Sequence, residues 1–275
     1  GIRDPLWSRG LGDVYKRQAT SNAGTANLST KAAGGTINMA ASNSGAYNIN
    51  GGAGDDILTG GGGNDVFTVA ATTEADDDTI NGGGGTDTIN LSTGTHTLDD
   101  DAKLANIERI VANSSGSTLV LTNQAEGFTL TGGSGTDDFT GGSGADVMTG
   151  GAGNDTFNVD SGTDTITDLG TGSDILVVSS GATANATNVS SFTATSATRN
   201  SGTATINSVA GGSTVDMSSS GLGGFTLAGN AGVDNLTGGT NNDIITGAGG
   251  NDIIIGGAGN DTITCLLYTS DAADE

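Results

Sequence analysis

An aspartate recurs at nine-residue intervals in three parts of this chain, always at the same place in a glycine-rich motif. The motif reads Gly-Gly-x-Gly-x-Asp-x-(apolar)-x, and most copies follow one another end to end. Seven copies fit it without deviation, at residues 51–59, 60–68, 82–90, 132–140, 141–149, 150–158 and 256–264. Degenerate copies at 159–167, 169–177, 229–237, 238–246 and 247–255 lengthen the second and third arrays.

The residue types in this motif suit the binding of a hard divalent cation. Glycine at the first, second and fourth places permits a tightly turning backbone with positive φ. Aspartate at the sixth place supplies carboxylate oxygens beside a turn whose carbonyl groups also face inward. Carboxylate and carbonyl oxygens are the ligands that Ca²⁺ prefers, so the motif predicts calcium sites in the turns.

The last three residues of each nonapeptide are expected to form a short strand, because the Thr, Val and Ile found there favour extended backbone. The middle residue of each strand should point inward and build a thin apolar core; these residues are Leu58, Phe67, Ile89, Phe139, Met148, Phe157 and Ile263. One nonapeptide is then a turn plus a strand, and two make a full coil of a solenoid. Each ion is shared between turns separated by one intervening repeat.

These repeats resemble the RTX (repeats-in-toxin), or haemolysin-type calcium-binding, family. The resemblance covers residues 51–90, with a gap, 132–177 and 229–264. It implies an all-β fold, a right-handed parallel β-roll or β-helix solenoid, with Ca²⁺ in the stacked turns and metal-free coils interspersed. Members of the family typically leave Gram-negative cells unfolded, by type I secretion, and fold outside.

Carried over position by position, the resemblance makes the motif aspartates calcium ligands, together with turn carbonyls. They are Asp56, Asp65, Asp87, Asp137, Asp146, Asp155, Asp234, Asp243, Asp252 and Asp261. Asp78, Asp164 and Asp174 are weaker assignments, because their turns lack one or more of the expected glycines. Asp168 lies outside this register and is expected to tolerate replacement by alanine.

The competing interpretation is that the aspartates only form turns, in which Asp is common. Turn formation alone does not explain why Asp stands at one fixed place in nearly every repeat. Unpaired carboxylates stacked in register would also repel one another strongly. The pattern therefore favours cation binding.

The two ends of the chain differ in composition from everything between them. Residues 1–18 and 265–275 resemble sequencing-library adapters translated in frame, so we expect them to be non-native and the rest to be a fragment of a longer protein. The expected organisation between the ends is lead β coils at 19–50, a first calcium array at 51–90, non-repeat coils or a loop at 91–131, a second array at 132–177, a linker and lead β coils at 178–228, and a third array at 229–264.

A longer period underlies the arrays. Residues 36–49, 118–130 and 214–227 align as a strand, a small polar turn and a second strand, with Tyr47, Phe128 and Phe225 in the equivalent place. The alignment predicts three modules whose lead segments are metal-free coils of the same solenoid.

Two segments are open to more than one interpretation. Residues 99–110 have the acidic start of a helix, but equally suit a loop followed by a strand at 107–111. Residues 179–199, rich in Ser, Thr and Ala, fit either a linker or a poorly ordered coil.

The charge of the chain excludes several classes of partner. The formal net charge is −23, and removing the five acidic and four basic residues of the terminal segments leaves 26 acidic and four basic residues, a charge of −22. Binding of nucleic acid or of anionic membrane surfaces depends on clustered Lys and Arg, so neither is an expected partner. No apolar run is long enough to span a bilayer, and residues 19–264 contain no cysteine.

The sequence shows no constellation for catalysis. His96 is the only histidine, and we expect it to be a surface residue of a Thr-rich loop. There is no His-Glu-x-x-His zinc motif, Gly-x-Ser-x-Gly elbow or phosphate-binding loop with lysine. We therefore do not expect the chain to be an enzyme.

The leading functional hypothesis is a calcium-binding piece of a secreted, repetitive bacterial protein of adhesin, surface-layer or matrix type that folds on binding extracellular calcium. Its partners would be calcium ions and cell-surface or matrix components. The main alternative is the carboxy-terminal secretion and folding module of an exported protease, lipase or haemolysin. A polysaccharide-binding solenoid is a third hypothesis, weakened by the shortage of aromatic residues.

Overall fold

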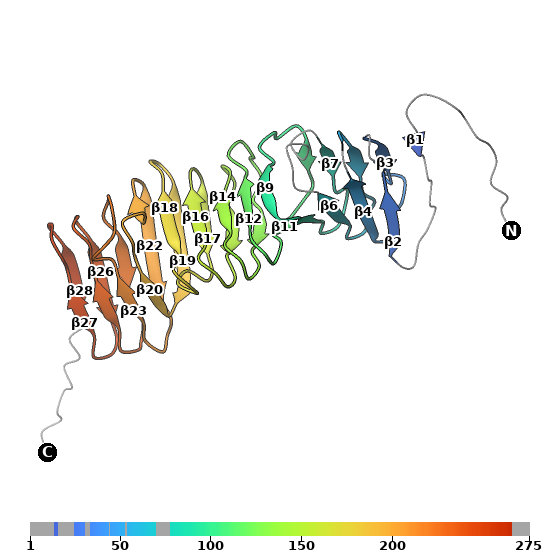
Figure 1. Ribbon diagram of the computed structural model, residues 1–275. Helices are drawn as coiled ribbons and strands as arrows, with labels where there is room; N and C mark the ends of the chain where they lie inside the picture. The colour runs from blue at the N-terminus through green and yellow to red at the C-terminus, as the bar shows by residue number, and fades with distance from the viewer. Residues whose placement is uncertain are drawn as a thin grey trace, which may run out of the picture.

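The protein is an all-β solenoid in the part of the chain that the computed structural model describes, residues 14–15, 25–30, 34–43, 45–52, 54–69 and 78–265. These residues form 28 short strands and no helix, and therefore no helix that could cross a membrane. Every pair of neighbouring strands is parallel. Figure 1 shows the strands stacked along one axis into an elongated body, which confirms the predicted solenoid.

One sheet of 13 strands runs along the whole solenoid. In spatial order its strands are β2 (Ala26–Ser29), β4 (Tyr47–Gly52), β6 (Val66–Val69), β8 (Thr88–Leu91), β11 (Arg109–Val111), β13 (Thr129–Thr131), β15 (Val147–Thr149), β17 (Thr163–Ile166), β19 (Thr183–Val189), β22 (Thr203–Ser208), β24 (Thr226–Ala228), β26 (Ile244–Ala248) and β28 (Thr262–Cys265). Because this sheet is continuous, the calcium arrays and the coils between them belong to one solenoid.

The opposite side of the solenoid is divided among three sheets. The first contains β1 (Val14–Tyr15), β3 (Thr36–Asn38), β5 (Ile57–Thr59), β7 (Thr79–Asn81) and β10 (Leu104–Ala105). The second contains β9 (Gly94–Thr97), β12 (Ser117–Val120), β14 (Asp138–Thr140), β16 (Thr156–Val159), β18 (Ile175–Val178) and β21 (Arg199–Asn200). The third contains β20 (Ser191–Thr193), β23 (Thr214–Asp216), β25 (Asn235–Thr237) and β27 (Ile253–Ile255).

The change from one of these three sheets to the next happens within a single coil. Between β8 and β11 the chain forms both β9, which pairs with β12, and β10, which pairs with β7. Between β19 and β22 it forms both β20, which pairs with β23, and β21, which pairs with β18. Each junction thus ends one sheet and begins the next, and the three sheets correspond to the three modules of the longer period.

The two ambiguous segments are settled by these strands. Residues 99–110 contain no helix; β10 and the start of β11 lie there, as in the loop-and-strand interpretation. Residues 179–199 form β19 and β20 within the solenoid, so both the linker and the poorly ordered coil are wrong. Of the terminal segments, Val14–Tyr15 pairs with β3 and Cys265 ends β28, while their other residues lie outside the described part of the chain.

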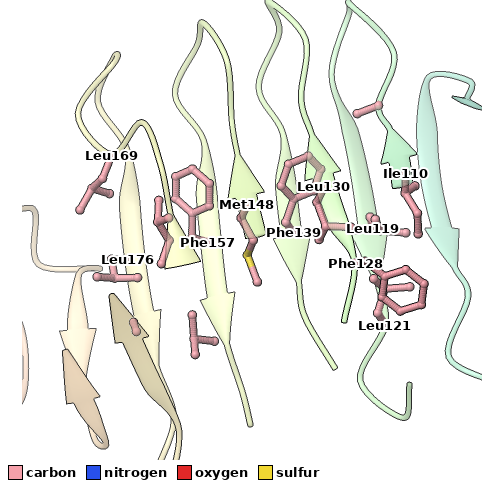
Figure 2. Packing of buried hydrophobic residues seen from close by; sticks show 14 of the residues in the cluster. Ile110, Leu119, Leu121, Phe128, Leu130, Phe139, Met148, Phe157, Leu169 and Leu176 are labelled. Carbon is pink, nitrogen blue, oxygen red and sulfur yellow. The ribbon is translucent and has the colours of Figure 1, made fainter. Parts of the chain in front are cut away.

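The apolar core follows the strand alternation that the repeat predicts. The middle residues of the strands, Leu58, Phe67, Ile89, Phe139, Met148 and Phe157, are at most 1% exposed. Figure 2 shows such side chains stacked in a row between the two sides of the solenoid. Ile263 was expected to be among them but is 48% exposed, because β28 pairs with a strand on one side only within the described part of the chain.

His96 is not a surface residue. It lies in β9 opposite Leu119 of β12 and is fully buried, with its Nε2 atom 3.0 Å from the carbonyl oxygen of Ser92. The expectation of an exposed loop residue was wrong because the segment forms a strand, and strand alternation turns this side chain inward.

Candidate metal centre

The predicted ligands stack in columns at the turns of the solenoid. Each aspartate stands directly before a strand or at its start, so the parallel register of the strands places it beside the aspartate of the next coil. The pairing of Phe139 with Phe157, for example, sets Asp137 next to Asp155. The thirteen aspartates form six columns: Asp56–Asp78, Asp65–Asp87, Asp137–Asp155–Asp174, Asp146–Asp164, Asp234–Asp252 and Asp243–Asp261.

One hydrogen bond recurs along every column. The backbone N–H of Asp137 donates to Oδ1 of Asp155 at 2.8 Å, and the N–H of Asp155 donates to Oδ1 of Asp174 at 2.9 Å. The other columns repeat this bond at 2.6 to 3.0 Å. Each carboxylate therefore points toward the preceding coil.

The second carboxylate oxygen commonly accepts a hydrogen bond from a backbone N–H in the turn of its own repeat. The N–H of Gly133 donates to Oδ2 of Asp137 at 2.9 Å, and the same bond forms at Asp65, Asp146, Asp174, Asp234 and Asp243. These are the bonds that the turn-forming interpretation requires. They do not exclude a cation, because each carboxylate oxygen has two lone pairs and one N–H occupies only one of them.

The first glycine of the nonapeptide leaves room where two kinds of oxygen converge. A Cβ atom on Gly132 would lie 2.7 Å from Oδ2 of Asp137 and would overlap the carbonyl oxygen of Gly150 in the next coil. Gly238 stands in the same relation to Asp243 and to the carbonyl oxygen of Gly256. A carboxylate and a backbone carbonyl thus meet at one place in these turns, as they also do at Gly60, Gly82 and Gly229, and this is the oxygen set suited to Ca²⁺.

Most of these carboxylates are removed from water. Asp56, Asp65, Asp78, Asp87, Asp137, Asp146, Asp155, Asp164, Asp174, Asp234 and Asp243 are buried, whereas Asp252 and Asp261 are partly exposed. Oδ2 of Asp87, Oδ2 of Asp164 and Oδ1 of Asp234 are buried without a hydrogen-bond partner. A buried charged oxygen without a partner is costly, so these atoms favour a bound cation.

Burial and mutual repulsion shift the acidity of these groups. Burial, together with the nearby carboxylates of Asp65 and Glu108, raises the pKa of Asp87 to about 6. Burial raises the pKa of Asp155 to about 6 as well. Burial and the charges of Asp146 and Asp160 raise the pKa of Asp164 to about 7. Ionisation of these groups therefore destabilises the fold unless positive charge compensates it.

Asp160 is a functional candidate that the repeat pattern did not reveal. It stands at the second glycine place of the degenerate copy 159–167, and its Oδ1 atom is buried without a hydrogen-bond partner. Burial raises its pKa too. The signal in the sequence was an acidic residue where the motif has glycine.

Asp168 is also part of a turn, although it lies outside the register. Its carboxylate accepts the N–H groups of Gly150 at 2.9 Å and Gly151 at 2.7 Å. In several other repeats the second glycine donates this bond to its own motif aspartate, which in this repeat is Asp155. The structure therefore gives a reason to expect that Asp168 does not tolerate replacement by alanine, contrary to the sequence-based expectation.

Aromatic residues head one column in each module. The N–H groups of Tyr47, Phe128 and Phe225 donate to Oδ1 of Asp65, Asp146 and Asp243 at 2.7, 2.8 and 2.7 Å. All three side chains are buried. Each occupies the place of a motif aspartate in a lead coil, so the column of carboxylates ends there and an aromatic residue takes the next position.

A bound cation would need backbone carbonyl oxygens among its ligands. Among the described residues, no group of three or more His, Cys, Asp or Glu side chains gathers closely enough to hold a metal ion. The motif predicts this, because it provides one carboxylate per turn and supplements it with turn carbonyls. The donor set fits Ca²⁺, which would offset the repulsion between carboxylates of adjacent coils.

Comparison with known families agrees with this geometry. A family profile for the RTX calcium-binding nonapeptide repeat matches the chain four times, at residues 43–70, 71–95, 131–166 and 228–263. The chain carries RTX calcium-binding repeats. The four RTX matches contain every predicted ligand except Asp174, which follows the third match. No curated protein matches the chain.

Proposed function

We propose that this RTX repeat protein is a structural element of a secreted bacterial protein, of adhesin, surface-layer or matrix type, that folds on binding extracellular calcium. The observation that carries the proposal is the stacking of buried carboxylates in register, some of them with unpartnered oxygens. Such columns are compatible with a compact chain when divalent cations lie between the coils.

The energetics support folding coupled to calcium binding. An ion that binds only the folded state adds RT ln(1 + [L]/Kd), about 2.7 kcal/mol when the ion is 100-fold above its Kd. Several such sites would together match the ~5–15 kcal/mol net stability of an ordinary domain. Extracellular calcium modules bind at about 10⁻⁴–10⁻³ M, and at about one to ten times Kd each site adds only about 0.4–1.4 kcal/mol, so folding depends on many sites acting together. The chain would therefore stay unfolded at low cytosolic calcium and fold outside the cell.

The architecture supports a structural role. The 13-stranded sheet runs unbroken through the RTX arrays and the coils between them, which makes the described chain a rod rather than a string of domains (Figure 1). A rod stiffened by calcium suits a spacer or matrix component. The alternative, a secretion and folding module of an exported enzyme, uses the same calcium chemistry, and the reading frame that flanks residues 19–264 distinguishes the two.

Circular dichroism of the chain during a calcium titration tests the proposal. After calcium removal the spectrum should be that of a largely unfolded chain, and a β-sheet signal should grow cooperatively as calcium is added. Sodium chloride at matched ionic strength is the control for simple charge screening of this acidic chain. Magnesium is the control for the divalent charge, because it requires a smaller octahedral site. A spectrum that is the same in chelator and in calcium would contradict the proposal.

A further inference from the structure

The coil that follows the first RTX array has no glycine repeat, yet it continues a column of motif aspartates. The pairing of Thr88 with Arg109 places Glu108 beside Asp87. The N–H of Asp65 donates to Oδ1 of Asp87 at 2.6 Å, and the N–H of Asp87 donates in turn to Oε2 of Glu108 at 2.7 Å. Glu108 therefore takes both the place and the hydrogen bond of a motif aspartate.

Asn106 takes the place of the first glycine in the same coil. The pairing of Ala105 with Asn81 sets Asn106 beside Gly82. Asn106 has a positive φ of 54°, as several second-place glycines such as Gly83 do. A Cβ atom on Gly82 would overlap the carbonyl oxygen of Asn106 and Oδ2 of Asp87. A carbonyl and a carboxylate oxygen thus converge here as they do at Gly132 and Gly238 inside the arrays.

The Oδ2 atom of Asp87 is left available at this place. In several repeats, the second glycine donates its N–H to this oxygen, as Gly61 does to Asp65 at 2.7 Å. At the equivalent position, the N–H of Gly83 donates to Oδ1 of Asn81 at 3.0 Å instead. Oδ2 of Asp87 is consequently buried without a hydrogen-bond partner, on a residue that is 1% exposed.

The carboxylate of Asp87 and the carbonyl of Asn106 therefore converge at Gly82. The Glu108 carboxylate adjoins them through its hydrogen bond with the Asp87 N–H, and no positive charge is among these hydrogen-bond partners. The unpartnered oxygen is costly in a buried position, and the Asp87 and Glu108 charges repel each other. Glu108 is itself exposed, so its second oxygen can turn toward the site. All three donors are the hard oxygens that Ca²⁺ prefers.

We propose that Asp87, Glu108 and the carbonyl oxygen of Asn106 bind a calcium ion in a turn that lacks the nonapeptide. The second RTX match ends at residue 95, so the repeat pattern does not mark this site. It lies in the coil where the first of the three short sheets ends with β10. Calcium binding there extends cation-dependent order beyond the array into a coil that would otherwise be metal-free. The inference rests on the proposed calcium-binding function and adds a ligand to it.

The test compares Glu108→Gln with Glu126→Gln in the full chain. Glutamine keeps a side-chain oxygen that can accept the N–H of Asp87, but it removes the charge, so it separates a calcium ligand from a mere hydrogen-bond acceptor. Glu126 is exposed, and its replacement changes the net charge equally. Calorimetric calcium titration and metal analysis at saturation are the measurements. Glu108→Gln should bind one ion fewer, or bind it about tenfold or more weakly, and Glu126→Gln should behave as the unmodified chain.

Two outcomes overturn the inference. If Glu108→Gln matches Glu126→Gln in stoichiometry and affinity, while Glu108→Ala lowers the melting temperature in saturating calcium, Glu108 only accepts a hydrogen bond. The calcium-binding function of the arrays then stands. If the unmodified chain binds no calcium at all, the proposed function fails first and this site fails with it.

Discussion

Acid should substitute in part for calcium in folding this protein. The carboxyl groups of Asp87, Asp155 and Asp164 have pKa values of about 6, 6 and 7 in the folded chain, raised from an ordinary 3.8 chiefly by burial. Because the folded state holds these protons more tightly than the unfolded state, the free energy of unfolding without calcium falls as pH rises from about 4 to about 7. The metal-free fold is thus most stable in acid.

The size of this effect follows from the shifts. One pKa unit corresponds to about 1.4 kcal/mol, and we halve the result because the solenoid is thin and nearby solvent screens these charges. Asp164 then contributes ~2 kcal/mol, and Asp87 and Asp155 contribute ~1.5 kcal/mol each, again with that screening discount. The expected loss of stability between about pH 4 and about pH 7 is therefore roughly 5 kcal/mol for the calcium-free chain.

Urea denaturation followed by circular dichroism measures this loss. The chain is freed of calcium by dialysis and checked by metal analysis, because chelators weaken in acid. Without calcium, the β-sheet signal should be larger and more resistant to urea at about pH 5 than at about pH 8, where the chain is expected to be largely unfolded. The difference should shrink or reverse in saturating calcium, since calcium needs the deprotonated ligands. A calcium-free chain whose β-sheet signal at about pH 5 is no larger and no more resistant to urea than at about pH 8 would refute the reasoning.

A matched pair of variants separates this effect from the general relief of charge repulsion in acid. Asp164→Asn removes a buried titrating group and keeps an oxygen for the N–H of Asp146, which donates to it at 3.0 Å. It should stabilise the calcium-free chain at about pH 8 by ~2 kcal/mol, after the same screening discount, and weaken the response to calcium. Asp100→Asn removes an exposed carboxylate that accepts the N–H of Ala102, and the side-chain oxygen of asparagine can accept the same bond. This control variant should change neither the stability of the calcium-free chain nor its response to calcium.

Three further predictions concern single positions. Asp146→Ala should raise the calcium concentration at the midpoint of folding and also lower stability in calcium, because the Asp146 carboxylate accepts the N–H groups of Phe128 and Gly142. Asp146→Asn should raise this midpoint with a smaller loss of stability. An unchanged midpoint in a calcium titration would speak against Asp146 as a ligand. Asp168→Ala should cost about 1–3 kcal/mol in urea denaturation, since two backbone N–H groups lose a charged acceptor; a variant as stable as the parent would restore the view that Asp168 is outside the turn. Gly132→Ala should prevent calcium-induced folding or weaken it strongly, because its Cβ would overlap the backbone carbonyl oxygen of Gly150 and lie 2.7 Å from Oδ2 of Asp137, whereas Gly211→Ala, with nothing nearer than 3.9 Å, should be close to neutral by thermal melting.

The sequence by itself determined the repeating architecture. The nonapeptide combines glycines for the turn, a β-favouring triplet for the strand and one apolar residue for the core, and each of these acts within nine residues. That is why the inward positions such as Phe67 and Phe157 were predicted. The equivalence of Tyr47, Phe128 and Phe225 was also visible, since it is a matter of spacing along the chain.

Only the tertiary structure decided which residues outside the motif meet the columns. Glu108 reaches Asp87 because one coil replaces a six-residue turn by a three-residue turn while keeping the strand register, and no local pattern encodes that neighbour. Asp168 and Asp160 lie in a part of the chain where the nonapeptide is degenerate, and their carboxylates are placed in the turns by the stacking of neighbouring coils. His96 is buried because it belongs to β9, the strand that starts a new sheet. Contacts between coils join residues about 18 to 25 positions apart, so they depend on how the coils stack. The conformation of each coil, in contrast, is determined by the residues within it.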